Sequence, residues 1–555
     1  MGEGEAGVPV ITVRTDRVLS MVGASKEEVV EALPLVGIHL EEVSDEWIRL
    51  EYDPNRPDFS TDYGVARALK GRLGRVAGAP GHRLRSSGWK ISVERRVKQV
   101  RPFVVGLLAR GLALDDETIR QLIGMQEDLH QGIGRRRRKL AIGLHDAGAI
   151  SPPIRYDAVA NTFSFTPLGS KSAMTVRQVL KETETGKRYG DILKGALAFP
   201  MLTDGAGTVL SFPPIINGSA TALTERTSDL FVDVTGTEPG VMDDALAIIA
   251  EALWDAGGEV LSVKVEEEGK ERTTPSLRPR RMSISGEDVG GLLGLNLSAE
   301  ETVEALRRCR LDASAGGGRV AVSIPRYRAD ILHAVDLVEE VGYGYGFERL
   351  EPAYDFRYSK GKASERSRRL DALRRVAVGL GLQEVMNYSL TSVEVLRDRV
   401  LRSDTGQLKV DSPKSRMYEY LRDMLSPDVL RVLSENVHEP YPQKVFEIST
   451  AFHRDAKTEA GVKETPVLAA AVSADRATYT EIRSILDTLL LRSFGGRPGY
   501  SEGSMPFLIE GRTAFCELDR RPIGFLGEVK PEVLAGFGLR MPVALLEIDI
   551  SSFLP

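Results

Sequence analysis

Cysteine is scarce in this chain of 555 residues: only Cys309 and Cys516 occur, and they form no CxxC spacing. Two thiols so placed supply neither a disulfide framework nor a cysteine zinc site, so we expect a reducing, cytoplasmic location. No apolar run reaches the ~18 residues that a transmembrane helix needs, so no contact with a membrane is expected. The first ten residues lack the basic start and apolar core of a secretion signal.

Positive charge is not in excess either. The formal net charge is −6 and the isoelectric point is near 5.9, which speaks against a general nucleic-acid coat but permits a local basic groove. The densest basic run is Arg135–Lys139, directly before the apolar Leu140–Ile142. Charge alone leaves two readings open for this run: a solvated loop or strand edge, or a contact for phosphate groups.

The length exceeds what one hydrophobic core can organise, so we expect roughly three to five domains. Hydrophobic residues make up 42% and charged residues 27% of the chain, which is ordinary for globular domains of mixed α and β structure. Turn-rich residues 77–81 predict the end of a first domain, and the charged residues 266–275 predict a linker. The glycine-rich residues 315–318 predict a hairpin turn, and residues 359–364 precede a long amphipathic helix.

Two short segments predict helix starts. Ser25 is followed by Glu28, and Ser298 is followed by Glu301, each pair ahead of apolar residues spaced three to four apart. This is the capping-box arrangement, in which the serine and the glutamate satisfy each other's backbone N–H groups. We expect both to be structural features of ordinary half-buried helices.

An acidic cluster is the most chemically suggestive segment. Asp336, Glu339 and Glu340 have the i, i+3, i+4 spacing of one helix face, and Asp330 lies six residues before the first of them. Clustered carboxylates repel one another unless a cation lies among them, and oxygen-only ligands suit Mg²⁺. The alternative is a solvated acidic helix face, with Asp330 complementing the N-terminal helix dipole.

The pattern around these acids resembles the signature of the metal-binding helical module in phenylalanyl-tRNA synthetase β subunits of the archaeal and eukaryotic type. The matching positions are Pro325, Arg328, Asp330, Ile331, Asp336, Leu337, Glu339, Glu340, Tyr345 and Gly346. The resemblance implies that the four acids, Asp330, Asp336, Glu339 and Glu340, bind Mg²⁺ near a contact with the α subunit.

The resemblance extends over nearly the whole chain. The segments at residues 126–146, 213–218 and 230–237 are similar to the family's editing domain, which hydrolyses tyrosine wrongly esterified to the same tRNA. An apolar pocket rejects the extra hydroxyl of tyrosine poorly, so a second site must remove the error. The resemblance implies that the editing pocket contains Leu202, Ser211, Asp233 and Thr235.

Judged without the family, the segment Asp233–Thr237 is typical of a strand that ends in a polar turn. His145 beside Asp146 forms a further polar pair, which we rank below the four implied pocket residues. No Ser–His–Asp triad is evident in this part of the sequence, so we expect a positioned water to carry out the hydrolysis.

The last third resembles the core of a class II synthetase. An active core needs an arginine after the aromatic residue of its second motif, to hold the α-phosphate of ATP. Here Glu447 follows Phe446 and would repel that phosphate. We therefore expect this core to be non-catalytic, with ATP and phenylalanine bound by the α subunit.

We thus expect an α+β multidomain chain in four parts. These are an N-terminal helical and β module (residues 1–85), an α/β tRNA-editing domain (86–270), a winged-helix-like Mg²⁺-binding module (275–352) and a class II synthetase-like antiparallel sheet core without catalytic motifs (358–555).

The resemblance implies an α₂β₂ phenylalanine–tRNA ligase in which this β subunit supports attachment of phenylalanine to tRNA(Phe) and hydrolyses tyrosyl-tRNA(Phe). A tRNA-docking scaffold with an inactive editing site is the alternative. An independent hydrolase is disfavoured, because it would have no use for the four acids or for a non-catalytic core.

Overall fold

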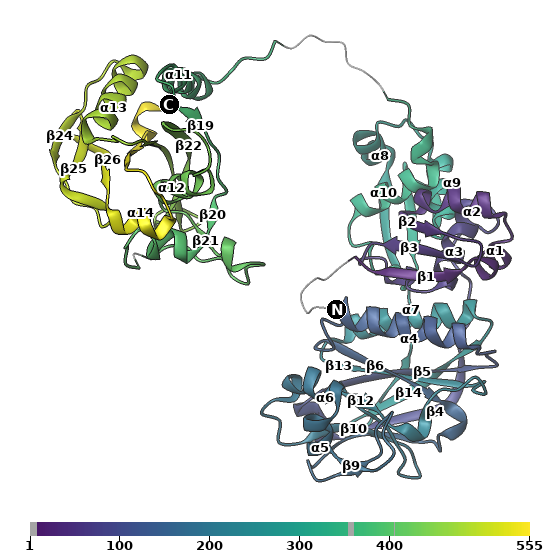
Figure 1. Ribbon diagram of the computed structural model, residues 1–555. Coiled ribbons are helices and arrows are strands. Elements are labelled where there is room, and N and C mark those ends of the chain that lie inside the picture. Colours follow the sequence, from purple (N-terminus) through teal and green to yellow (C-terminus); the bar gives the residue numbers. More distant parts are fainter. Residues whose placement is uncertain (1–7, 353–359, 405) are drawn as a thin grey trace. The chain divides into compact units, whose positions relative to one another are not determined.

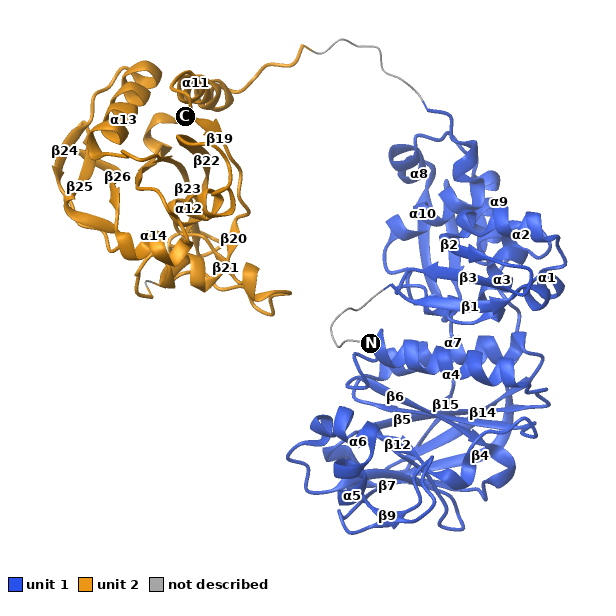
Figure 2. Cartoon of the chain, viewed as in Figure 1, with its two compact units in different colours: residues 1–354 blue, residues 355–555 orange. Residues whose placement is uncertain are grey.

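The computed structural model describes residues 8–352, 360–404 and 406–555. The chain divides into two compact units, residues 1–354 and 355–555 (Figure 2). The expected start of the last domain at residue 358 lies outside the described residues. Within the described stretches, no helix is long and apolar enough to span a bilayer.

The N-terminal part of the first unit is a small antiparallel sheet covered by helices (Figure 1). Its strands, in spatial order, are β1 (Val10–Arg14), β3 (Trp47–Tyr52) and β2 (Ile38–Val43). Its helices are α1 (Thr15–Val22), α2 (Lys26–Ala32) and α3 (Asp62–Arg72). The predicted capping box of Ser25 and Glu28 is present at the start of α2, which confirms that helix start.

A ten-stranded sheet dominates the rest of the first unit, with the order β12-β11-β10-β7-β4-β14-β5-β13-β6 and β15 paired to β14. Its strands are β4 (Arg85–Val93), β5 (Phe103–Arg110), β6 (Leu140–Asp146), β7 (Ile154–Val159), β10 (Phe199–Thr203), β11 (Val209–Phe212), β12 (Ile216–Asn217), β13 (Leu230–Gly236), β14 (Glu259–Glu267) and β15 (Lys270–Thr274).

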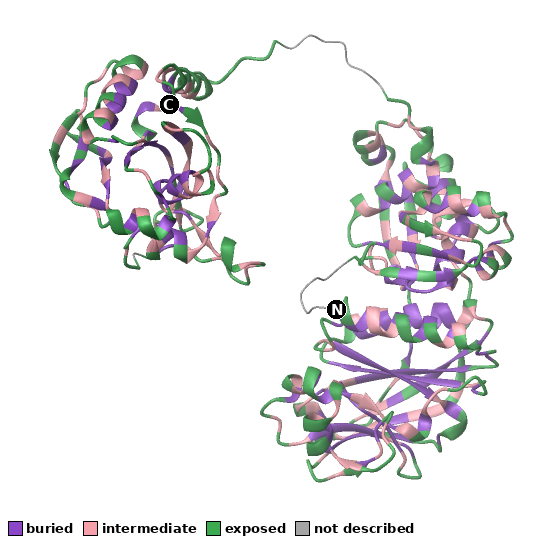
Figure 3. Cartoon of the chain, in the orientation of Figure 1, coloured by how far each residue is buried: buried purple, intermediate pink, exposed green. Residues whose placement is uncertain are grey.

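Two long helices, α4 (Asp116–Gln131) and α7 (Pro239–Asp255), lie side by side over one face of this sheet (Figure 1). Their apolar side chains share one core with β5, β6 and β13. These central strands are therefore buried on both faces, as Figure 3 shows, and they read as continuous apolar runs rather than as alternating ones.

The charged residues 266–275 are not a linker, so that expectation is wrong. They belong to the β14–β15 hairpin, in which Val263 pairs with Thr274. Their charges pair across strands, for example Lys264 with Glu271 at 2.9 Å. The hydroxyl of Thr274 also donates to the Gly106 carbonyl at 2.7 Å, which ties the hairpin to β5. Cross-strand ion pairs and a sheet ladder thus account for a composition that resembles a solvated linker.

The third part of the first unit holds a three-stranded sheet and three helices. The strand order is β16 (Arg280–Ser285), β18 (Arg319–Ile324) and β17 (Asp312–Gly316). The helices are α8 (Gly286–Leu293), α9 (Ala299–Arg308) and α10 (Ala334–Tyr345). The predicted capping box at Ser298 opens α9, and the predicted turn connects β17 to β18, with positive φ at Gly317 and Gly318. Both predictions are confirmed.

The second unit is a seven-stranded sheet with helices on both faces. Its order is β19 (Gln383–Glu384), β22 (Gln443–Arg454), β23 (Val462–Ser473), β27 (Val543–Asp549), β26 (Arg521–Val529), β25 (Leu508–Leu518) and β24 (Gly499–Glu502), and every pair except β19–β22 is antiparallel.

Alternate residues of the strands pack into two hydrophobic cores on opposite faces of the sheet, because side chains alternate between faces along a strand. Phe446 belongs to the core with α11 (Glu365–Gly379) and α13 (Tyr479–Phe494). Its neighbour Val445 belongs to the core with α12 (Ser426–Glu435) and α14 (Pro531–Phe537).

Candidate functional site

A cavity of about 360 Å³ opens in the large sheet of the first unit. Its walls come from α4, from β6 and β13, and from β11 with the loop that follows it. The polar side chains that line it are Gln126, Glu127, Arg137, Thr185, Ser211, Asn217 and Asp233. Apolar residues including Ile123, Leu168, Phe212 and Ile215 complete the lining, so the cavity suits an amphipathic ligand.

Asp233, which lines this cavity, forms a buried polar pair with His145, which lies outside the lining. The strands β13 and β6 are antiparallel neighbours, with Asp233 opposite Gly143, so His145 follows two residues along the same face. The His145 Nε2 atom lies 2.8 Å from the Asp233 Oδ2 atom, and both side chains are buried. A Cβ atom at Gly143 would lie 2.2 Å from that same carboxyl oxygen, so the close approach requires glycine.

Thr221 completes the network around the imidazole. Its hydroxyl oxygen lies 2.9 Å from His145 Nδ1. A neutral ring satisfies both contacts when Nε2–H donates to Asp233 and Nδ1 accepts from the hydroxyl of Thr221. His145 thereby fixes the orientation of the Asp233 carboxyl group, whose Oδ1 atom remains an acceptor for a ligand.

Ser211 and Leu202 are paired across β10 and β11. The Ser211 hydroxyl is buried and finds no hydrogen-bond partner among the described residues, and Ser211 lines the cavity. Leu202 is fully buried in a hydrophobic core with Phe231 and is not among the lining residues. An unpaired buried hydroxyl costs about 1–3 kcal/mol, so a ligand atom that bonds Ser211 would recover that loss.

Thr235 points to the same side of β13 as Asp233, as its spacing predicts, but its hydroxyl is already used. It accepts a hydrogen bond of 3.1 Å from Nε of Arg101, which also donates to the Thr235 carbonyl at 2.9 Å. Burial of Arg101 lowers its pKa to about 10. Of the four implied pocket residues, Ser211 and Asp233 line the cavity, and Leu202 and Thr235 do not.

Sequence reasoning ranked His145 below the four implied pocket residues, and in the structure both of its ring nitrogens have hydrogen-bond partners. Sequence reasoning assigned no role to Gln126 or Asn217. Gln126 donates to the Ile142 carbonyl at 2.6 Å, and Asn217 donates to the Leu144 carbonyl at 3.4 Å. Both therefore secure β6, the strand that carries His145. The two-residue spacing of Gly143 and His145 indicates that both lie on one face of β6. That they meet Asp233 follows only once the register of β6 on β13 is known.

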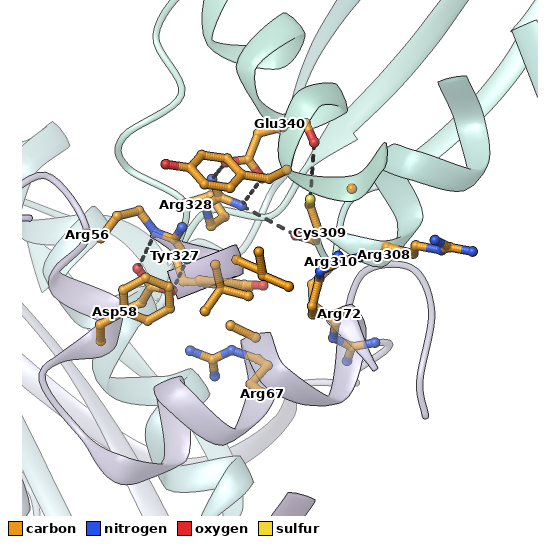
Figure 4. Close-up of a pocket in the computed structure, with 16 residues that line it drawn as sticks. Arg56, Asp58, Arg67, Arg72, Arg308, Cys309, Arg310, Tyr327, Arg328 and Glu340 are labelled. Carbon is orange, nitrogen blue, oxygen red and sulfur yellow. Dashed lines mark hydrogen bonds and ion pairs between the residues drawn. The ribbon is translucent and has the colours of Figure 1, made fainter. Parts of the chain in front are cut away.

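Two of the four acids of the cluster are bound to a buried arginine, Arg328, and Figure 4 shows its contact with Glu340. The Arg328 guanidinium is 1% exposed and donates to Asp330 at 2.6 and 2.9 Å and to Glu340 at 2.5 and 2.9 Å. Burial alone would raise the pKa of Asp330, but the charge and hydrogen bonds of Arg328 lower it to about 2. A guanidinium therefore supplies the positive charge that two of these acids need.

The other two acids are placed differently. Asp336 accepts from the backbone N–H groups of Leu332 and His333 at 2.6 and 2.7 Å, at the start of α10. Glu339 is exposed, and partial burial together with the neighbouring carboxylates raises its pKa. In residues 8–352, 360–404 and 406–555, no three His, Cys, Asp or Glu side chains are grouped as a metal site. As placed here, the four acids do not fit one ion.

Glu447 in the second unit also has a cationic partner. Its Oε1 atom lies 2.8 Å from Arg422 Nη2, and both side chains are buried. The Asn387 side-chain amide donates to Glu447 Oε2 at 2.8 Å. The glutamate that follows Phe446 is thus held within a buried polar network, in which Arg422 also faces Asp428 at 3.8 Å.

Two family models match this chain. One, described as phenylalanyl tRNA synthetase beta chain CLM domain, covers residues 354–550, and the other, described as tRNA synthetase B5 domain, covers residues 282–347. Together with the multidomain α/β fold, these matches define the chain as a tRNA-synthetase component.

Relatives of nearly full length specify the family. The phenylalanine–tRNA ligase beta subunit of Archaeoglobus fulgidus is 39% identical over 98% of this chain and 99% of that protein. The same subunit of Methanococcoides burtonii is 36% identical over 98% of this chain and 100% of that protein. The chain belongs to the phenylalanine–tRNA ligase β-subunit family.

A solved structure agrees with this assignment. The crystal structure of an N-terminal fragment of the phenylalanyl-tRNA synthetase beta subunit from Pyrococcus horikoshii matches with a TM-score of 0.58 and 34% identity. The match covers 61% of this chain and 99% of the fragment.

Proposed function

We propose that this chain is the proofreading subunit of a phenylalanine–tRNA ligase. With an α subunit it supports ATP-dependent attachment of L-phenylalanine to tRNA(Phe), and in its own cavity it hydrolyses tyrosyl-tRNA(Phe). The observation that carries the editing proposal is that Asp233, held by its buried partner His145, lines the same cavity as the unpaired hydroxyl of Ser211.

Recognition of tyrosine follows from the lining of the cavity. The apolar walls accept an aromatic ring, and the Asp233 carboxyl group and the Ser211 hydroxyl offer hydrogen bonds to the phenol. Phenylalanine would leave these buried groups without a partner, and a site of this kind discriminates strongly against a ligand that lacks the hydroxyl. The cavity would thus bind the tyrosyl group of the mischarged tRNA in preference to the phenylalanyl group of the correct product.

The hydrolytic step needs no protein nucleophile in this arrangement. Ser211 has no base within hydrogen-bonding distance among the described residues, so it is not activated as a serine hydrolase nucleophile would be. We assign Asp233 and Ser211 to holding the substrate, with His145 as a positioning residue. A water held beside the ester, together with the ribose hydroxyls of the substrate, would complete the reaction.

Deacylation of tyrosyl-tRNA(Phe) by the complex with the α subunit tests this proposal. The variants Asp233→Ala and Ser211→Ala should each lower kcat/KM for tyrosyl-tRNA(Phe), while phenylalanylation stays at the wild-type rate. Clearance of tyrosyl-tRNA(Phe) that is unchanged in the double variant would reject the editing site. It would favour the alternative, a tRNA-docking scaffold with an inactive pocket.

We further propose that adenylation takes place on the α subunit and that the second unit of this chain contacts it. The pairing of Glu447 with Arg422 supports a non-catalytic core. Large side chains lie exposed on this unit, with Met386 at 91%, Tyr388 at 71% and Met417 at 60%. Exposed apolar residues of this kind suit the extensive interface of an obligate α₂β₂ assembly in the cytoplasm.

Magnesium remains a prediction for the third part of the first unit. Mg²⁺ typically takes one or two carboxylates and keeps several waters. Glu339 and the second oxygen of Asp336 would suffice for that, with further ligands from the α subunit, whereas Asp330 and Glu340 are committed to Arg328. Loss of Mg²⁺-dependent stabilisation of the complex in Glu339→Gln would support this division of roles.

A further inference from the structure

The basic run that the sequence left open forms a strained turn beside the cavity. Three consecutive residues, Arg135, Arg136 and Arg137, have positive φ values of 49°, 54° and 63°. A left-handed backbone costs about 1–2 kcal/mol for each residue that carries a Cβ atom. Glycine or asparagine would relieve that cost, so a run of arginines here requires a reason outside the turn itself.

Hydrogen bonds from buried side chains fix the backbone of this turn. The buried Arg101 guanidinium donates to the carbonyls of Arg137 at 3.3 Å and Arg138 at 3.5 Å. The Arg137 side chain turns inward, where it donates to Glu127 at 2.6 Å and to the Ile215 carbonyl at 3.0 Å. Arg137 is also one of the residues that line the cavity. A strained backbone segment persists when the surrounding contacts hold it in place, as these do.

The three other arginines of the turn point outward. Arg135, Arg136 and Arg138 are exposed, and across the described stretches none of their guanidinium groups has a hydrogen-bond or ion-pair partner. Many other exposed arginines of the chain do pair, as Arg120 does with Asp116 at 2.5 Å. The turn therefore concentrates three unneutralised cations next to the cavity, in a chain whose formal net charge is −6.

We infer that Arg135, Arg136 and Arg138 bind the phosphodiester groups of the single-stranded tRNA end that delivers the aminoacyl ester to the cavity. This inference rests on the proposed editing function. A cavity of about 360 Å³ has room for an aminoacyl ester and little of the nucleic acid behind it, so the adjoining backbone must lie against the surface outside. Guanidinium forks match phosphate oxygens, and a backbone fixed in advance lowers the entropy that binding costs.

The test uses the triple variant R135Q/R136Q/R138Q in the complex with the α subunit. For tyrosyl-tRNA(Phe) we expect KM to rise by about tenfold or more near physiological salt, with kcat within about twofold of wild type. The slope of log(kcat/KM) against log[KCl] should become shallower by about 0.7 for each lost contact, or about 2 in total. A charge-matched control is R278Q/R281Q/R366Q, which removes three exposed arginines outside the editing domain.

A small substrate separates phosphate binding from damage to the cavity. Hydrolysis of 2′(3′)-O-tyrosyl-adenosine, which carries the ester but no phosphate, should be the same for the triple variant and the wild type. An equal loss on both substrates, or unchanged KM and salt slope on tyrosyl-tRNA(Phe), would overturn the inference.

A third measurement does not depend on hydrolysis. Alkylation of the phosphates at the 3′ end of tRNA(Phe) should weaken its binding to the wild type and not to the triple variant. Interference that is identical in the two proteins would overturn the inference, even if the wild type hydrolyses no tyrosyl ester. Failure of the proposed function and failure of this inference are therefore distinguishable.

Discussion

The Nε2 atom of His145 lies 2.8 Å from the Oδ2 atom of Asp233, although 88 positions separate the two residues along the chain. Neighbouring strands bring them together, and the absence of a side chain at Gly143 leaves room for the contact. Because both side chains are buried, the Asp233 carboxyl group and the His145 imidazole satisfy each other's hydrogen bonding at this contact.

Removing the imidazole should impair editing without affecting ligation. In His145→Ala, the Asp233 carboxyl group loses the partner that orients it, and an unpaired buried group costs about 1–3 kcal/mol. We expect kcat/KM for tyrosyl-tRNA(Phe) deacylation to fall by about tenfold to a hundredfold. Phenylalanine-dependent ATP–pyrophosphate exchange by the complex should not change, and an equal fall in both activities would contradict a positioning role.

Gly143→Ala should displace the same pair by steric conflict. The added methyl group would lie 2.2 Å from Asp233 Oδ2 and 2.5 Å from His145 Nε2, well inside van der Waals contact. Editing should fall and the urea midpoint should drop. Gly124→Ala is the matched control, because a Cβ atom there meets nothing within 4 Å and alanine in a helix is favoured over glycine by about 0.5–1 kcal/mol.

The arginine at the centre of the acidic cluster should be a stability residue. Arg328→Met leaves the buried carboxyl groups of Asp330 and Glu340 unpaired, and breaking a buried ion pair on one side costs about 3–5 kcal/mol. We expect the urea midpoint of the first unit to fall sharply. In contrast, Glu339→Gln, at an exposed position, should leave that midpoint within experimental error; equal losses in the two variants would contradict the division between the two pairs of acids.

Glu547 should make the second unit less stable in alkaline solution. Burial raises the pKa of Glu547 to about 7, above its ordinary value, although its Oε2 atom accepts from the backbone N–H of Ser426 at 2.7 Å. Because the folded pKa lies above the unfolded one, the associated stability is present below about pH 4.5 and is lost as the pH rises through 7.

The measurement for Glu547 compares the wild type with Glu547→Gln, which keeps an acceptor oxygen and cannot ionise. The urea midpoint of the variant, relative to wild type, should rise between pH 5 and about pH 8, because only the wild type loses stability through ionisation. A difference that does not vary with pH would show that Glu547 does not titrate in this range.

Local features of this protein were readable from the sequence because their interactions close within a few residues. The capping boxes at Ser25 and Ser298 and the glycine turn between β17 and β18 were all predicted and found. The helix that carries Asp336, Glu339 and Glu340 also follows from their spacing, since α10 contains all three. The motifs further identified the family, which nearly full-length relatives support.

What those residues do was decided by partners that sequence spacing cannot reveal. Helical periodicity placed the acids together, but the buried Arg328 divides them. Charge composition predicted a linker where β14 and β15 form a hairpin. The family resemblance ranked Thr235 above His145, and the folded chain pairs His145 with Asp233 and Thr235 with Arg101. Hydrogen bonds within a turn or helix are fixed by sequence distance, but contacts between strands depend on register and burial, which only the folded chain determines.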